Sequence, residues 1–326
     1  MSQKHKTTSS QHNVRVALAG LTAAAATTAM TAAMIYVRKH DVHIRPSVSG
    51  PVVVKTLSER QNPTGYPVRV MQMGGVYQSA TYLDVDHMNE PVFKYYKVFD
   101  DLFAASAPAH RQVPSILLLG GGAFSYPKHL LYTHPTATID VVEIDPQVVE
   151  IARKYFYLAP LEFDFAPKKD NDGNDLAVTQ SGGIPRLSIK NGDGRTYLEH
   201  TQPGRYDAII NDTFTGKYAA PNLVTREAAQ VAKRALSQGG VYVANIVSAQ
   251  DGADVSFLRD EVATLSKVFA HVYIELADDE TFGGEDNYIV LASDEKLNVD
   301  DIPYDKDFLG KVLRDPRGLK RLVAHK

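Results

Sequence analysis

Three consecutive glycines, 120–122, follow a short apolar run at 116–119. Glycines at the end of a strand let backbone N–H groups approach a ligand that a Cβ atom would block. A second, largely apolar run at 139–144 carries acids at Glu143 and Asp145. A carboxylate at this point can accept hydrogen bonds from two ribose hydroxyls. Together, these residues predict a nucleoside-binding pocket.

Two later apolar runs also end in polar residues, at Asp193-Gly194 and at Asn211-Asp212. A carboxylate at Asp193 can accept a hydrogen bond from the amino group of adenine. Each acid by itself is more often a helix cap or a solvated loop residue. Because the carboxyl ends of parallel strands meet at one edge of a sheet, these residues together predict a single pocket.

A nicotinamide-binding fold would explain the glycines and Glu143 equally well. Its glycine fingerprint, however, requires a further glycine at position 125, which is Ser125 here. An NAD-dependent oxidoreductase is therefore the second interpretation of these residues.

Strand-like and helix-like segments alternate along the chain, which predicts an α/β fold with a parallel sheet covered on both faces. Short β-branched and aromatic runs at 52–84 predict a small antiparallel sheet before it. The main sheet should have about seven strands. Its last two strands are joined through Gly283-Gly284, too short a link for a parallel crossover, so the final strand should be antiparallel. A helix is expected between the glycines and the run at 139–144. Further helices are expected at 90–105, 146–156, 193–200, 225–237, 254–269 and 308–323, and a solvated loop at 166–185.

The composition excludes several classes of function. A formal net charge of -3 over 326 residues, with no basic stripe, argues against nucleic acid as a partner. The chain has no cysteine, which excludes disulfides, thiolate catalysis and cysteine-ligated zinc.

The N-terminal segment differs in kind from the rest of the chain. Residues 16–37 carry no charged side chain and are followed by Arg38 and Lys39. Their number would suit one membrane-spanning helix, but they are rich in Ala and Thr rather than in Leu and Ile. The alternatives are a membrane anchor, a cleaved signal and an Ala-rich helix. If the pocket takes a cytosolic nucleoside cofactor, the main domain should be cytoplasmic.

The combined motifs resemble those of the spermidine synthase family, the polyamine aminopropyltransferases. They read GGGAFSYPKHLL, VVEIDPQVVEIARKYF, NGDGRTYL, YDAIINDTF and LSQGGVYVANI, and VYQSATYLD precedes them. The resemblance covers 68–294 and is closest to divergent members. It implies a Rossmann-like, methyltransferase-type seven-stranded sheet with a small N-terminal β-domain, and a homodimer. The implied organisation is a tail at 1–45, a β-domain at 46–90, the nucleoside-sulfonium domain at 91–295 and a helical tail at 296–326.

The resemblance also implies a reaction, in which an amine attacks the carbon next to a sulfonium. The donor would be S-adenosylmethionine or decarboxylated S-adenosylmethionine, the acceptor a small-molecule amine or other nucleophile, and no metal would be needed. Asp212 falls at the family's catalytic acid, and Tyr77, Tyr96 and Thr215 near the substrate. The implied contacts to the donor are Gln78, Gly120, Gly121, Gly122, Glu143, Asp145, Asp193 and Gly194.

Three positions depart from the family pattern. Ala123 replaces the acid that follows the third glycine and binds the amino end of the aminopropyl group. Thr215 replaces a second acid after Asp212, and Tyr95-Tyr96 replaces a Tyr-His pair. Because buried ammonium groups need charged partners, the sequence does not predict efficient spermidine synthesis from putrescine. A methyltransferase without polyamine activity and a non-catalytic, membrane-tethered binding protein remain as alternatives.

Overall fold

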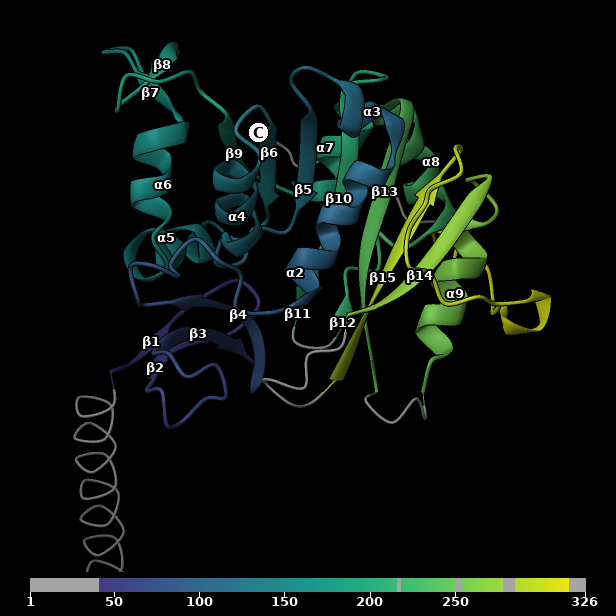
Figure 1. The fold of residues 1–326 in the computed structure, drawn as a ribbon, viewed down its shortest axis with the longest axis horizontal. Coiled ribbons are helices and arrows are strands. Elements are labelled where there is room, and N and C mark those ends of the chain that lie inside the picture. Colours follow the sequence, from purple (N-terminus) through teal and green to yellow (C-terminus); the bar gives the residue numbers. More distant parts are fainter. Residues whose placement is uncertain (1–40, 216–217, 250–253, 278–284, 317–326) are drawn as a thin grey trace, which may run out of the picture. The chain divides into compact units, whose positions relative to one another are not determined.

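In the computed structural model, the structure describes residues 41–215, 218–249, 254–277 and 285–316 (Figure 1). The expected N-terminal anchor at 16–37 and the Gly283-Gly284 connection lie outside these residues. Within them, none of the helices has the length and apolar character needed to cross a membrane. From Ile44 onward the chain forms one unit.

A sheet of seven strands forms the centre of this unit. Its five strands from β9 to β13 run parallel, whereas β15 is antiparallel to both of its neighbours, β13 and β14. The last strand is thus inserted between two earlier ones, which confirms the predicted antiparallel pairing. The order across the sheet is β14 (His271–Ala277), β15 (Glu285–Ser293), β13 (Leu236–Ala249), β10 (Tyr206–Asn211), β5 (Ser115–Leu119), β6 (Thr138–Glu143) and β9 (Leu187–Asn191).

Helices cover both faces of the sheet, because its central strands are apolar on both sides. In β5, Ile116 and Leu118 pack into one core, whereas Leu117 and Leu119 pack into the other. The first core receives α2 (Tyr95–Val98), the 3₁₀ helix η1 (Phe99–Ala104), α4 (Ser125–Thr133), α5 (Pro146–Tyr155) and α6 (Leu158–Phe165). The second receives α7 (Gly194–His200), α8 (Arg226–Ala235) and α9 (Ser256–Leu265). The short α3 (Ser106–His110) contacts η1, β10 and β13.

The predicted small β-domain is a four-stranded sheet in the order β1 (Val42–Arg45), β2 (Val52–Leu57), β3 (Val68–Met73) and β4 (Val76–Tyr82). The pairs β2–β3 and β3–β4 are antiparallel. Val52, Val54 and Met71 pack against Ala123 and against Val148 of α5. This apolar cluster fixes the small sheet over the glycine loop of the main domain.

Three expectations about local structure were wrong. The segment expected to be a loop at 166–185 contains a hairpin of β7 (Pro167–Lys169) and β8 (Asp175–Thr179). The segment expected to be one helix at 90–105 is not helical before Tyr95. It continues as the two short helices α2 and η1, and α3 follows Ala105. The helix expected at 308–323 does not begin within the described residues: the short η2 (Lys306–Phe308) is followed by an irregular path to residue 316, and 317–323 lie outside the described part.

Candidate functional site

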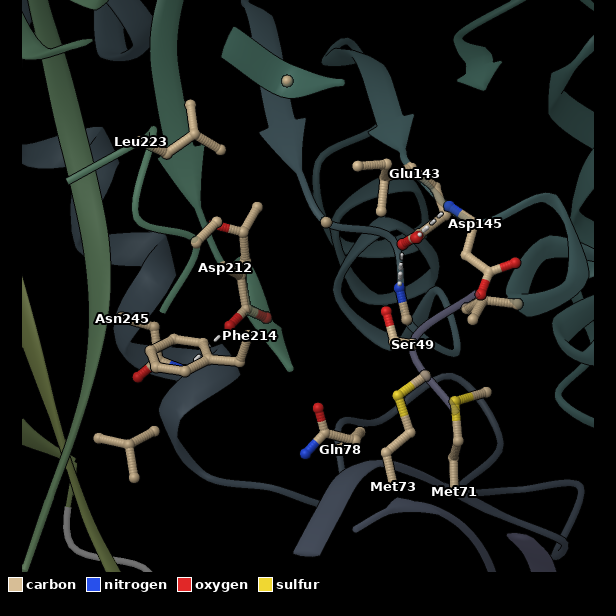
Figure 2. A pocket seen from close by; sticks show the side chains of 18 of the residues that line it. Ser49, Met71, Met73, Gln78, Glu143, Asp145, Asp212, Phe214, Leu223 and Asn245 are labelled. Carbon is tan, nitrogen blue, oxygen red and sulfur yellow. Dashed lines mark hydrogen bonds between the residues drawn. The ribbon is translucent and has the colours of Figure 1, made fainter. Parts of the chain in front are cut away.

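A cavity of about 720 Å³ lies at the carboxyl ends of the parallel strands, beside β3 and β4 of the small sheet (Figure 2). It brings together most of the residues that the sequence analysis assigned to one site. Of the described residues that line it, four carry carboxylates and none is basic. The predicted residues on its wall are Tyr77, Gln78, Tyr96, Gly120, Gly122, Glu143, Asp145, Asp193, Gly194 and Asp212.

Glu143, at the end of β6, is bonded to the glycine loop. Its Oε2 accepts hydrogen bonds from the backbone N–H of Gly121 (2.8 Å) and Gly122 (3.2 Å), and Oε1 accepts one from Asp145 N–H (2.9 Å). The side chain is 7% exposed. Burial raises the pKa of Glu143, and these backbone N–H groups oppose the rise by stabilising the ionised form. The carboxylate is therefore held rigidly at the cavity wall.

Gly120 turns the chain from β5 towards the cavity with φ +89°. A Cβ atom here would collide with the backbone carbonyl oxygen of Asp212. The position therefore requires glycine both for its left-handed conformation and for the close approach of the two strand ends. Gly121 lies beside the cavity wall, and its backbone N–H donates a hydrogen bond to Glu143.

Asp145 and Asp193 cap helices. Asp145 accepts hydrogen bonds from Gln147 N–H (2.9 Å) at the start of α5 and from Val48 N–H (2.7 Å). Asp193 caps α7 through Thr196 N–H (2.8 Å), and its other oxygen accepts from Asn222 Nδ2 (2.9 Å). Both acids reach the cavity, but in this structure their carboxylates are bonded within the protein.

Asp212, directly after β10, has both carboxylate oxygens bonded. Asn245 Nδ2 donates to Oδ1 (2.9 Å), and the Tyr95 hydroxyl donates to Oδ2 (3.4 Å). Burial raises the pKa of Asp212 to about 6, the two donors lower it, and the charge of Glu143 adds to the rise. The group is thus a carboxyl that titrates just below neutral pH.

Aromatic side chains from α2 and the segment before it form the wall beside Asp212. The rings of Tyr95 and Tyr96 lie with centroids 4.1 Å apart, and Phe93 stacks with both. The Tyr96 hydroxyl is hydrogen-bonded to that of Ser79 (3.3 Å). Burial raises the pKa of both tyrosines, so each keeps its hydroxyl hydrogen.

Two of the departures from the family pattern have different outcomes. Ala123 is 1% exposed and packs in the apolar cluster with Val52, Val54 and Met71, not on the cavity wall. Thr215 ends β11 (Phe214–Thr215), which pairs with β12 (Tyr218–Ala219), and its side chain lies outside the described part. Its role near the substrate stays a prediction.

The sequence analysis missed several residues on the cavity wall, among them Asn245, Phe214, Met71 and Met73. Figure 2 shows Asn245 and Phe214 beside Asp212, and the two methionines on the side of Glu143 and Asp145. A signal existed for Asn245 alone, since it is a polar residue within the apolar strand GGVYVANIV. Among the residues that the structure describes, no cluster of His, Cys, Asp or Glu has the geometry of a metal site.

The chain is similar in sequence to two transferases. The chain is 34% identical over 161 residues to a polyamine aminopropyltransferase of Vibrio vulnificus and 31% identical over 175 residues to putrescine N-methyltransferase 3 of Nicotiana tabacum. These matches cover 48% and 51% of the chain, and 44% and 40% of the two relatives. The chain thus spans less than half the length of either relative.

Solved structures share the fold. A probable spermidine synthase from Corynebacterium glutamicum superposes with a TM-score of 0.58 at 24% identity, over 78% of this chain and 81% of that one. Spermidine synthase from Thermotoga maritima gives 0.54 at 20% identity, over 82% of each chain. The model of the spermine/spermidine synthase domain matches residues 100–299, which include the strand ends carrying Glu143, Asp193 and Asp212. By this match over more than half of its length, the chain belongs to the spermine/spermidine synthase family.

Proposed function

We propose that this protein is a transferase that binds an adenosyl sulfonium donor and moves an alkyl group from it to an amine. One observation carries the proposal: Glu143 and Asp212 lie on two sides of one cavity whose described wall has acids and no bases (Figure 2). Such a cavity favours a cationic nucleoside and a cationic acceptor over any anionic ligand.

The nucleoside end would be held at the strand ends around Glu143. In the bound state, the remaining acceptor position on Oε1 of Glu143 would accept a hydrogen bond from a ribose hydroxyl, while the bonds from Gly121, Gly122 and Asp145 are kept. Gly194 adds close packing there, since a Cβ atom would meet Leu119 and Leu223 side-chain atoms at 3.3 Å. A flat adenine ring could lie against this narrow part of the wall.

In the transfer step, the nitrogen lone pair of the neutral amine forms a bond to the carbon next to sulfur. The carbon–sulfur bond breaks, and its electron pair remains on sulfur as a neutral thioether. The nitrogen thereby becomes positively charged and then loses a proton. Asp212 would accept a hydrogen bond from the amine, orient it and stabilise this charge. The pKa of Asp212 is about 6, whereas that of a free amine is about 10. Asp212 is therefore a weak base towards an ammonium group, and its main role would be to orient the amine.

The cavity favours the decarboxylated donor over intact S-adenosylmethionine. The N–H groups of Gly121 and Gly122 are already bonded to Glu143, and the described wall carries no basic side chain for a donor carboxylate. Methyl transfer is the second candidate, because Ala123 offers no carboxylate to the amino end of an aminopropyl group.

Reactions with each donor and a panel of amines, analysed by mass spectrometry, test both candidates, since the product mass identifies the transferred group. Calorimetric titration with methylthioadenosine and with NAD should show binding of methylthioadenosine. Binding of NAD alone would replace this proposal with an oxidoreductase. Binding of methylthioadenosine without turnover of any amine would support a non-catalytic binding protein.

A further inference from the structure

We propose that Asp315 is a positioning residue for the nucleoside subsite, and that it acts by holding the 220–225 loop against α7. This inference rests on the proposed nucleoside binding. It adds a residue that does not line the cavity itself but determines how tightly the cavity binds.

Asp315 has both carboxylate oxygens bonded, one to α7 and one to the cap of α8. Oδ1 accepts a hydrogen bond from the Thr225 hydroxyl (2.6 Å), and Oδ2 accepts one from Arg195 Nη2 (3.2 Å). Thr225 caps α8, because its hydroxyl oxygen accepts from Ala228 N–H (3.2 Å). The hydroxyl has a single hydrogen and donates it to Asp315, which leaves its lone pairs for the helix. Asp315 therefore fixes the orientation of this cap as well as that of Arg195.

Arg195 connects Asp315 to the loop. It follows Gly194 at the start of α7, and its side chain is 11% exposed. Nη1 donates to the backbone carbonyl of Asn222 (3.3 Å), and Nε donates to Glu199 (3.0 Å). The side-chain amide of Asn222 donates in turn to Asp193 (2.9 Å). The loop is thus bonded to the residues immediately before and after Gly194.

The 220–225 loop forms one wall of the cavity. Its residues on that wall are Ala220, Pro221, Asn222 and Leu223. Leu223 lies close to Gly194, since a Cβ atom on Gly194 would be 3.3 Å from the Leu223 side chain. Figure 2 shows Leu223 across the cavity from Glu143. The position of the loop therefore sets the space for a nucleoside between Leu223 and Glu143.

The segment that carries Asp315 is held in place without the help of this carboxylate. The carbonyl of Leu313 accepts from Arg226 N–H (2.9 Å), and Leu313 N–H donates to the Thr264 hydroxyl (2.8 Å). The backbone N–H of Asp315 donates to Glu227 (3.0 Å). These bonds join the segment to α8 and α9. Replacing the carboxylate should therefore leave the segment in place and release only Arg195 and Thr225.

Loss of the carboxylate should weaken nucleoside binding more than amine binding. Arg195 would keep Glu199 but could adopt other rotamers, and the loop bonded to it would become more mobile. A ligand that contacts the loop would then have to order it on binding, which lowers affinity. Asp212 is held by Tyr95 and Asn245 instead, so the amine should be affected less.

Calorimetry and steady-state kinetics of the full-length Asp315→Ala variant test the inference. The Kd for methylthioadenosine and the KM for the donor should rise by about fivefold to tenfold, while the KM for the amine changes little. In Asp315→Asn, the remaining side-chain oxygen can still accept from Thr225, so the rise should be smaller. Unchanged affinity in Asp315→Ala would overturn the inference and leave the proposed function intact. A wild-type protein that does not bind methylthioadenosine would overturn the proposed function itself.

Asp305→Ala is the matched control. Asp305 lies in the same segment and accepts hydrogen bonds from the backbone N–H groups of Asp307 (2.9 Å) and Phe308 (3.2 Å), but it does not bond to Arg195. This variant should keep the wild-type affinity for methylthioadenosine. An equal loss of affinity in Asp305→Ala and Asp315→Ala would indicate a general loss of structure and would overturn the inference.

A double-mutant cycle tests whether Asp315 acts through the loop. Asn222→Leu removes the bond from the loop to Asp193, and Asp315→Ala removes the hold on Arg195. If both changes release the same loop, the double variant should lose less affinity for methylthioadenosine than the product of the two single fold-changes. Independent effects that multiply fully would contradict an action of Asp315 through this loop.

Discussion

The side-chain amide of Asn245 donates a hydrogen bond to Oδ1 of Asp212 over 2.9 Å. This bond joins β13 to the residue that directly follows β10, and the two strands are neighbours in the sheet. It stabilises the ionised carboxylate and so opposes burial, which raises the pKa of Asp212 to about 6. The pKa of Asp212 is thus lowered by a residue of the adjacent strand.

The first prediction concerns the pH dependence of catalysis. If ionised Asp212 holds the amine, as we propose, kcat/KM should fall as pH decreases through about 6. Asn245→Leu removes a donor to the ionised form, so this acid limb should move to higher pH by about one unit. Rate measurements from pH 5 to 9 check the shift.

Asn222→Leu is the control, because the side-chain amide of Asn222 donates to Asp193 and not to Asp212. This variant should leave the acid limb of the pH profile in place. An unmoved limb in Asn245→Leu would refute this tuning.

The second prediction separates the two acids at the end of β6. Glu143→Gln should weaken methylthioadenosine binding by about tenfold to a hundredfold, because a ribose hydroxyl loses a charged acceptor. Asp145→Asn should change this affinity little but lower stability by about 1 kcal/mol, because Asp145 caps α5 and holds Val48 N–H. Calorimetry and urea unfolding of both variants distinguish the roles. The reverse pattern would make Asp145 the nucleoside ligand and Glu143 a structural residue.

The central sheet and much of the site could be predicted from the sequence because their signals are local. The runs around Leu117 and Val141 are apolar on both faces. They end at Gly120 and Glu143, which lie at the same edge of the parallel part of the sheet. What could not be predicted depends on contacts distant in sequence. Met71 reaches the cavity because the small sheet packs on α5, and no local pattern encodes that packing.

The polar segment at 166–185 was predicted to be a loop from its composition, but its turn residues form a hairpin. Asp170 in the 166–185 segment accepts hydrogen bonds from Asp172 N–H (2.9 Å) and a second backbone N–H at Asn174. These bonds and a left-handed Gly173 close a hairpin where composition alone indicated a loop.

The third prediction addresses the departure at Ala123. Its environment is apolar, formed by Val52, Val54 and Met71. Ala123→Asp should therefore lower stability by about 3 kcal/mol, through a buried carboxylate without a partner, and should not improve binding of the decarboxylated donor. Urea unfolding and donor titration measure both effects, and Ala123→Val controls for added volume. Wild-type stability together with tighter donor binding would mean that an acid at 123 can reach the cavity.

The last prediction concerns Glu261 of α9, which is not on the cavity wall. The side chain is 1% exposed, its Oε2 has no hydrogen-bond partner, and burial raises its pKa to about 8 from an ordinary value of 4.5. The folded protein therefore keeps Glu261 protonated at pH values where the unfolded chain has released this proton. Folding then takes up a proton, so the stability present below pH 4.5 is lost as pH rises towards 8.

Glu261→Gln is uncharged at any pH, as the protonated acid is, and it should not show this loss. The variant should match the wild type near pH 4.5 and exceed its free energy of unfolding by about 2 to 4 kcal/mol at pH 8. Urea unfolding at both pH values measures the difference, with methylthioadenosine binding as a check that the cavity is intact. Parallel pH dependence in the two proteins would mean that Glu261 is already ionised in the folded protein, and would contradict this prediction.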